Sequence, residues 1–219
     1  MKTNILFSFF ILLFLVACGQ NNRKISDNTK PASDYAKQVN LSDDLSVATF
    51  AGGCFWCTEA AFDQLTGVKE VVSGYSGGKE ENPTYRQVSY GATSHAEAIN
   101  VYYDSKVITY QQLLDVFFVA HDPTQLNRQG NDVGAHYRSA IFYHTPEEKA
   151  MAEATIKKLD DAGKFPNPIV TEVTAATKFW DAEDYHQDYY KKNPNDRYML
   201  AVGVPKVKKV QKYFPEWIQ

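Results

Sequence analysis

The sequence predicts a single domain of mixed α-helices and β-strands, of either the α/β or the α+β class. The chain has 219 residues, 44% of them hydrophobic, which is enough for one buried core but short for two. Strand-like and helix-like patterns alternate along most of its length, and this alternation is typical of both classes. No internal repeat is present, so we expect one folded unit with one functional site.

The first part of the domain should contain two strands and one helix. Residues 47–50 form an apolar strand that leads into two glycines. Residues 58–65 have helical spacing, and Gly67 is placed to end that helix. A second strand is expected at residues 68–73, followed by a glycine-rich loop at residues 74–83.

The middle of the domain should contain a strand, a helix and a long loop. Residues 98–103 alternate as a strand does. Residues 110–120 have the spacing of a helix, with an apolar face formed by Leu113, Leu114, Phe117 and Phe118. Residues 121–136 are polar and show no apolar pattern, and a loop of this length in a compact domain usually has a function.

The last part should contain two strands and two helices. A strand is expected at residues 138–143, and Thr145, followed by a proline and two glutamates, starts a helix that ends before Gly163. A further strand is expected at residues 169–174 and a short helix at residues 182–192. The basic, aromatic tail beyond them is expected to pack as a C-terminal extension rather than to act as a functional tail.

Residues 1–17 are predicted to be a signal peptide. Lys2 precedes an apolar run at residues 5–16, which is shorter than the about 20 residues that a membrane-spanning helix needs. The stretch LVACG at residues 15–19 resembles the lipobox of bacterial lipoproteins, whose cysteine carries lipid. We therefore expect lipid on Cys18 to anchor the exported protein to a bacterial cell membrane, facing the periplasm or the exterior. An ordinary signal peptide with an incidental cysteine is the alternative.

The rest of the chain divides into a tether and the folded domain. Residues 18–44 are polar and rich in Asn, Lys, Ser and Asp, so they are predicted to be a flexible tether. The domain with its C-terminal extension occupies residues 45–219. The net charge is −3, with acidic and basic residues well mixed, and no basic stripe is available for a phosphate backbone. We expect a monomer that does not bind nucleic acid.

Cys54 and Cys57 are the strongest indication of chemistry. The chain has three cysteines, so lipid on Cys18 would leave a single Cys-x-x-Cys pair, which is typical of a reactive pair rather than a disulfide scaffold. Two glycines before Cys54 place it at a helix N-terminus, where the unpaired N–H groups should lower its pKa and favour the thiolate. A buried structural cysteine is the alternative.

Cys57 is the candidate resolving thiol. It lies three residues after Cys54, so the two side chains would face the same side of a helix. A sulfenic acid formed on Cys54 could therefore condense with Cys57 to a disulfide. A passive helix residue is the alternative, because disulfide geometry across one helical turn needs local adjustment.

Six stretches spread over roughly residues 47–195 form a set: GGCFWCTEAAF, VVSGYSGG, NPTYRQV, SHAEAINV, HDPTQLNRQGNDVGAHYRSAIF and AEDYHQDYYKKNP. Together they resemble the peptide methionine sulfoxide reductases of the A type, the MsrA family. The resemblance implies a two-layer α/β sandwich with a central mixed sheet, the ferredoxin-like fold of that family. It also implies reduction of the S epimer of methionine sulfoxide, free or in proteins. No metal or organic cofactor is implied, and a thioredoxin-like reductant restores the enzyme.

The resemblance assigns roles to residues by their places in these motifs. Cys54 is the attacking thiolate. Phe55 and Trp56 hold the substrate methyl group, a role that suits aromatic rings because they attract sulfur and methyl groups; core packing is the alternative for both rings. Glu97 is the general acid that protonates the sulfoxide oxygen, and an apolar site would raise its pKa enough to keep it protonated.

Further positions in the motifs correspond to the rest of the family's pocket. Tyr85 and Tyr137 carry hydroxyl groups that hold the sulfoxide oxygen, and Asp132 orients that network. Tyr189 is a further pocket residue, for which the adjacent Tyr190 is the alternative. His186 is expected to be a hydrogen-bond partner rather than a catalyst.

A metal site is not expected from the sequence. The histidines at positions 95, 121, 136 and 186 form no pair at i, i+4, and a single Cys-x-x-Cys supplies half of a structural zinc site. One branch of the resembling family carries resolving cysteines near the C-terminus, and this sequence has none there. Recycling would then use Cys57 or an external thiol.

Two other classes of function stay open on the residues alone. One is a thiol–disulfide oxidoreductase of the thioredoxin kind, because an exported lipoprotein with one Cys-x-x-Cys at a helix start fits that class. The other is a non-enzymatic binding lipoprotein, in which some of the 14 Tyr and 13 Phe residues line a ligand groove. Substitution of Cys54 would separate them, because it should abolish sulfoxide reduction but leave simple binding intact.

Overall fold

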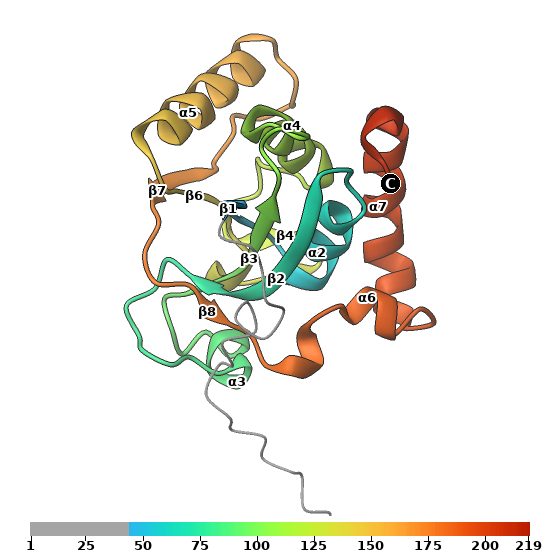
Figure 1. Cartoon of the computed structure of the whole chain (residues 1–219). Coiled ribbons are helices and arrows are strands. Elements are labelled where there is room, and N and C mark those ends of the chain that lie inside the picture. Colours follow the sequence, from blue (N-terminus) through green and yellow to red (C-terminus); the bar gives the residue numbers. More distant parts are fainter. Residues whose placement is uncertain (1–43) are drawn as a thin grey trace, which may run out of the picture.

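The computed structural model describes residues 44–219, which form a central β-sheet with helices packed against it (Figure 1). The strands are β1 (Ser46–Gly52), β2 (Val68–Ser76), β3 (Ala96–Tyr103), β4 (Arg128–Gln129), β5 (Asp132–Val133), β6 (Ser139–Tyr143), β7 (Glu172–Ala175) and β8 (Trp180–Asp181). The main sheet has the strand order β7-β6-β1-β3-β2-β8. The β6–β7 pair is parallel and the other pairs are antiparallel, so the predicted α/β fold with a central mixed sheet is confirmed.

Helices pack on this sheet and on one another. They are α2 (Phe55–Asp63), α3 (Tyr85–Ser89), α4 (Tyr110–Ala120), α5 (Pro146–Asp161), α6 (Tyr189–Lys192) and α7 (Val204–Tyr213). α4 begins with a capping box formed by Thr109 and Gln112, and its predicted apolar face is buried. On that face, the ring of Phe117 stacks on Phe50 of β1 with 5.1 Å between centroids. The core therefore lies between α4 and the middle of the sheet.

Several predicted boundaries change in the structure. The helix predicted at residues 182–192 is wrong, because the chain forms a 3-10 turn at Asp184–His186 and then the separate helix α6. Asp188 between them has a φ of +52°, a left-handed conformation that interrupts an α-helix. The predicted loop at residues 121–136 contains the β4–β5 hairpin and the start of a 3-10 turn, α2 starts earlier than expected, and the strand predicted from residue 169 starts later, as β7.

The C-terminal tail packs back over the helical layer. A π-helical turn at Met199–Gly203 continues into α7, whose Val207 and Val210 are buried. α7 contacts both α2 and α4, and an isolated β-bridge joins Leu65 to Ile218 near the end of the chain. This path brings the residues just before α7 to the start of α2.

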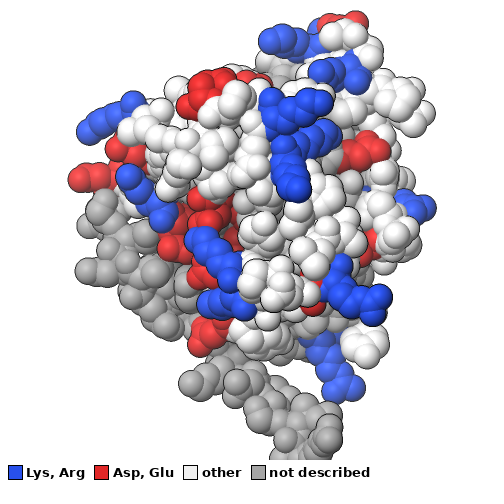
Figure 2. All heavy atoms as spheres, turned by 90° about the vertical axis from the view of Figure 1, so that its right-hand side faces the viewer, with Lys and Arg blue, Asp and Glu red and all other residues white. Residues whose placement is uncertain are grey.

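The surface that carries α7 has mixed charge. Figure 2 shows Lys and Arg side chains interspersed with Asp and Glu on this side of the molecule, as the well-mixed charges of the sequence predict. Among the helices of residues 44–219, none combines the length and the hydropathy needed to cross a bilayer. The predicted signal peptide at residues 1–17, the predicted lipidation of Cys18 and all but the last residue of the predicted tether at residues 18–44 lie outside the described residues.

Candidate active site

The end of β1 and the start of α2 place Cys54 beside Glu97. Cys54 is the N-cap residue of α2, and Glu97 lies near the start of β3, the antiparallel neighbour of β1. The backbone N–H of Phe55 donates to Glu97 Oε2 at 3.0 Å. The turn that joins strand to helix requires Gly53, which has a φ of +86° and where an added Cβ would lie 2.6 Å from Gln129 Cβ.

A cavity of about 190 Å³ opens at this turn. The residues that line it are Cys54, Phe55, Trp56, Tyr85, Glu97, Asp132, Tyr137 and Tyr198. All of them except Tyr198 were singled out from the sequence motifs, and they come from segments far apart in the chain. Two other candidates lie outside this lining. Cys57 is fully buried in an apolar cluster with Cys54, and Tyr189 stacks on Trp56 with 3.7 Å between ring centroids and 7° between planes.

Glu97 is a buried carboxyl group whose surroundings favour the neutral form. The residue is 1% exposed, and burial raises its pKa well above the ordinary value for glutamate. The nearby Cys54 sulfur raises this pKa further, and the hydrogen bond from Phe55 lowers it by a smaller amount. The site therefore holds an acid that keeps its proton at neutral pH next to the Cys54 sulfur.

The two thiols are free and close together, but their acidities differ from the expectation. Burial raises the pKa of Cys54 well above its ordinary value, and the neighbouring Cys57 raises it further. The predicted low pKa of Cys54 is therefore wrong, because burial outweighs the helix N-terminus. The pKa of Cys57 is lowered instead, first by a hydrogen bond with Cys54 and then by Lys206 and Tyr198.

Three tyrosine hydroxyl groups face the cavity. Burial raises the pKa of Tyr85 and of Tyr137, and the neighbouring carboxyl group of Glu97 adds to the effect, so both hydroxyls stay protonated and able to donate. Tyr198 donates its hydroxyl hydrogen to Asp132 Oδ2 at 2.5 Å. Sequence reasoning missed Tyr198 because it lies in the C-terminal tail, outside the recognised motifs, and no local pattern marks it.

Comparison with known proteins decides the family. The family model described as peptide methionine sulfoxide reductase matches residues 46–217, which is most of the chain. The chain belongs to this family. A relative named peptide methionine sulfoxide reductase MsrA from Haloquadratum walsbyi is 55% identical over 169 residues, covering 77% of this chain and 96% of the relative. MsrA 1 of Rhodopirellula baltica is 53% identical over 189 residues, covering 86% and 97%. The chain is thus a methionine sulfoxide reductase.

Solved structures of the family have the same fold. The reduced form of Mxr1 from Saccharomyces cerevisiae has a TM-score of 0.67 at 35% identity, covering 71% of this chain and 90% of that one. Methionine sulfoxide reductase A of Corynebacterium diphtheriae has a TM-score of 0.63 at 36% identity, covering 71% and 78%. The central mixed sheet of this reductase is therefore the fold of its family, as the resemblance implied.

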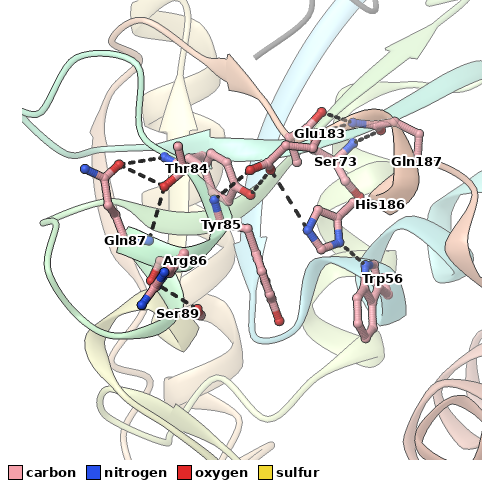
Figure 3. Close-up of polar contacts among 12 residues, drawn as sticks. Trp56, Ser73, Thr84, Tyr85, Arg86, Gln87, Ser89, Glu183, His186 and Gln187 are labelled. Carbon is pink, nitrogen blue, oxygen red and sulfur yellow. Dashed lines mark hydrogen bonds and ion pairs between the residues drawn. The ribbon is translucent and has the colours of Figure 1, made fainter. Parts of the chain in front are cut away.

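A segment after β8 supports two walls of the reductase cavity (Figure 3). Glu183 Oε1 accepts from the backbone N–H of Tyr85 at 2.9 Å, and its Oε2 accepts from the hydroxyl of Tyr75 at 2.8 Å. His186 Nδ1 accepts from the indole N–H of Trp56 at 3.0 Å, as expected for a hydrogen-bond partner. Burial lowers the pKa of His186 to about 3, so the ring is neutral and carries its proton on Nε2.

Buried side chains bind the segment after β8 to β2 and α2 of the reductase. Gln187 accepts from the backbone N–H of Ser73 and donates to its carbonyl oxygen, both at 2.9 Å. Glu59 of α2 accepts from the backbone N–H of Asp188 at 2.7 Å. Burial raises the pKa of Glu59 to about 8. These contacts fix the left-handed turn at Asp188 and, through it, the position of Tyr189 on Trp56.

No group of three or more His, Cys, Asp or Glu side chains within residues 44–219 is arranged to bind a metal ion. The acidic groups near the cavity have other partners. Glu97 accepts from Phe55 and Asp132 from Tyr198. The reactive groups that the structure places at the cavity are a thiol, a carboxylic acid and hydroxyl groups.

Proposed function

We propose that the protein reduces the S epimer of methionine sulfoxide, free or in proteins, with Cys54 as nucleophile and Glu97 as general acid. The observation that carries the proposal is the meeting of a thiol and a buried, neutral carboxylic acid in one small cavity. A sulfoxide oxygen is a poor leaving group until it is protonated, so attack on the sulfur needs an acid at this position. A carboxyl group with an ordinary pKa would already have lost its proton at neutral pH.

The reaction is the transfer of one oxygen atom. The Cys54 sulfur forms a bond to the sulfoxide sulfur while Glu97 delivers its proton to the sulfoxide oxygen, and the proton that the Cys54 thiol gives up restores the acid form of Glu97. The resulting hydroxyl group then passes to the Cys54 sulfur. The bond between the two sulfurs and the sulfur–oxygen bond of the substrate both break, and methionine leaves with the electron pair. The sum is methionine sulfoxide and a thiol giving methionine and a sulfenic acid.

The remaining residues of the cavity bind and orient the sulfoxide. We assign Phe55 and Trp56 to the methyl group, because aromatic rings attract methyl groups and sulfur. The protonated hydroxyls of Tyr85 and Tyr137 donate to the sulfoxide oxygen, where negative charge develops. Asp132 keeps the hydroxyl network in place, and Tyr189 backs Trp56 by stacking.

Recycling in this proposal uses Cys57. Its sulfur attacks the Cys54 sulfenic acid to form a disulfide, and a thioredoxin-like donor then reduces the disulfide, with no metal or organic cofactor. The contact of the two thiols in one buried cluster supports this pairing. Action as a monomer is part of this proposal.

We also propose that lipid on Cys18 holds the enzyme at a bacterial membrane, outside the cytoplasm. The support is the sequence LVACG at residues 15–19 and the apolar run before it. Growth with a radioactive fatty acid should label the protein and bring it into the membrane fraction. The Cys18→Ser variant should be unlabelled and absent from that fraction. Labelling of this variant would refute lipidation at Cys18.

A single turnover tests the reaction. The full chain carrying Cys18→Ser is reduced, freed of reductant and mixed with S-methionine sulfoxide. Methionine and the Cys54–Cys57 disulfide are then measured by chromatography and peptide mass mapping. We expect one methionine per chain and the loss of two hydrogens from the protein, and no methionine from the R epimer.

Two variants assign the thiols in that experiment. Cys54→Ser should form no methionine, and Cys57→Ser should form methionine once and remain a sulfenic acid. Lack of methionine from the protein with both thiols would overturn the proposal. Reduction of a disulfide-bonded protein such as insulin at the expected rate of sulfoxide reduction would instead favour a thiol–disulfide oxidoreductase.

A further inference from the structure

The proposed resolving thiol, Cys57, lies against the π-helical turn that leads into α7. Cys57 is fully buried, and a Cβ added at Gly203 would lie 3.7 Å from Cys57 Sγ, so the helix approaches the sulfur closely. Lys206 follows Gly203 by three residues and therefore lies on the same face of the helix. Its Nζ is 3.5 Å from the carbonyl oxygen of Gly52, which lies just before Cys54. An ammonium group thus reaches the turn that carries both thiols.

The groups around Cys57 in the described part of the chain have opposing effects on its ionisation. The thiol of Cys54, the ammonium group of Lys206 and the hydroxyl of Tyr198 lower its pKa, in that order. Burial and the carboxylate of Asp132 raise it. Lys206 is the cation in this set, and it belongs to the C-terminal extension rather than to any motif that carries the family resemblance.

We propose that Lys206 is a positioning residue for the resolving step, because its ammonium group holds Cys57 as the thiolate that attacks the Cys54 sulfenic acid. This rests on the proposed function, in which Cys57 is the resolving thiol. In the step, the Cys57 sulfur bonds to the Cys54 sulfur, the sulfur–oxygen bond of the sulfenic acid breaks, and the hydroxide takes a proton from solvent and leaves as water. Lys206 acts through Cys57 and is not a lining residue of the substrate cavity.

A comparison of lysine variants tests this in the full chain carrying Cys18→Ser. Lys206→Met removes the charge and keeps most of the stem, and Lys206→Arg keeps a cation. Lys208→Met is the matched control, because Lys208 is an exposed residue of the same helix. A reduced sample is mixed with S-methionine sulfoxide, quenched at intervals and analysed for methionine and for the Cys54–Cys57 disulfide across a range of pH.

Lys206→Met should form methionine as fast as the parent protein. This result would also show that the variant is folded. Disulfide formation should slow about three- to tenfold at neutral pH, because the thiolate fraction falls while the remaining thiolate is a somewhat better nucleophile. The pH at which this step reaches half its maximal rate should rise by about one unit. Lys206→Arg and Lys208→Met should both resemble the parent protein.

Disulfide formation in Lys206→Met with the parent's rate and pH midpoint would overturn the inference. Equal slowing in Lys208→Met or in Lys206→Arg would overturn it as well, because the effect would then not depend on a cation at this position. Failure of the proposed function has a different signature. The protein with Lys206 intact would then form no methionine, or would form methionine without the Cys54–Cys57 disulfide.

Discussion

Glu97 keeps its proton because of its position in the fold rather than because of its residue type. The ordinary pKa of a glutamate is about 4.5, and burial beside the Cys54 sulfur raises it well above that value. The same burial raises the pKa of Cys54. The cavity therefore favours neutral groups, and a substrate oxygen that gains electron density can draw the proton from Glu97. The carboxylic acid and the thiol thus depend on one shared environment.

Replacement of Glu97 by Gln should remove the general acid and keep the shape of the side chain. We expect the rate of methionine formation to fall by about 10²- to 10⁴-fold. In the parent protein this rate should decline as the pH rises through the pKa of Glu97, because the protonated form is the active one. The variant should lack that decline. Rapid-quench single turnovers across pH measure both effects, and an unchanged rate in Glu97→Gln would exclude this residue as the acid.

Tyr198→Phe should weaken catalysis without removing a ring from the cavity wall. The substitution deletes the hydroxyl that donates to Asp132 and leaves a partly buried carboxylate short of one partner, a loss of about 1–3 kcal/mol. We expect kcat/KM to fall about five- to 100-fold. Tyr213→Phe, at an exposed tyrosine of α7, is the control and should leave kcat/KM unchanged. Equal kinetics in the two variants would show that the hydroxyl of Tyr198 has no part in catalysis.

Most of the cavity could be predicted from the sequence because its residues sit in short, recognisable strings. Phe55 and Trp56 follow Cys54 directly, and Glu97 stands in SHAEA. The low pKa predicted for Cys54 failed because burial is set by the whole fold and outweighs the local helix start. Tyr198 could not be found because its partner, Asp132, is 66 residues away in the chain.

α7 is joined to the site by apolar packing as well as by Lys206. Its Val207 and Val210 are buried, and the helix contacts both α2, which carries the thiols, and α4. The turn that leads into α7 contains the buried Met199, adjacent to Tyr198. The packing of this helix therefore sets where the last wall of the cavity lies.

Val210→Ala should test how much this packing contributes to stability. Removal of two buried methyl groups should lower the free energy of unfolding by about 2 kcal/mol. Lys209→Ala, at the exposed neighbouring position, should change it by less than about 0.5 kcal/mol. Denaturant unfolding measures both. Similar values for the two variants would mean that α7 adds little to the stability of the domain.

The helices and strands that follow simple periodicity were predicted well, and those fixed by side-chain contacts were not. The strands β1, β2, β3 and β6 and the helix α4 have apolar patterns that their own sequences reveal. The stretch predicted as a helix at residues 182–192 is broken at Asp188. That break is held by Glu59 and Gln187, whose partners lie on distant parts of the chain, and no local pattern records such contacts.

The stability of the whole domain should depend on the protonation of Glu59. Its pKa in the folded protein is about 8, against an ordinary value of 4.5. Between these values the folded state keeps a proton that the unfolded chain releases, so stability should fall as the pH rises, by about 1.4 kcal/mol per pH unit. Below this range Glu59 is protonated in both the folded and the unfolded state, so stability does not depend on its titration. Above this range Glu59 is ionised in both states, and the loss of stability is complete.

Glu59→Gln should remove this pH dependence while keeping an acceptor for the backbone N–H of Asp188. Between pH 4.5 and about 8, the free energy of unfolding of the parent protein should fall relative to that of the variant as the pH rises. Above this range the difference between the two proteins should no longer change with pH. Urea titrations of both proteins at several pH values provide the measurement. A difference in unfolding free energy that stays the same at every pH would show that Glu59 does not cause the pH dependence of stability.

The proposed reacting groups and the C-terminal segments around the cavity differ in how the chain holds them. Cys54 and Glu97 adjoin β1 and β3, which pair with each other and with strands on both sides, whereas His186, Tyr189 and Tyr198 lie on segments joined to the body largely through side chains. Backbone amides of the central strands should exchange with deuterium only on global unfolding, and those of residues 183–203 through local openings. We therefore expect a folded protein that carries an oxidised methionine to be admitted by displacement of these outer segments, while the thiol and the acid keep their separation.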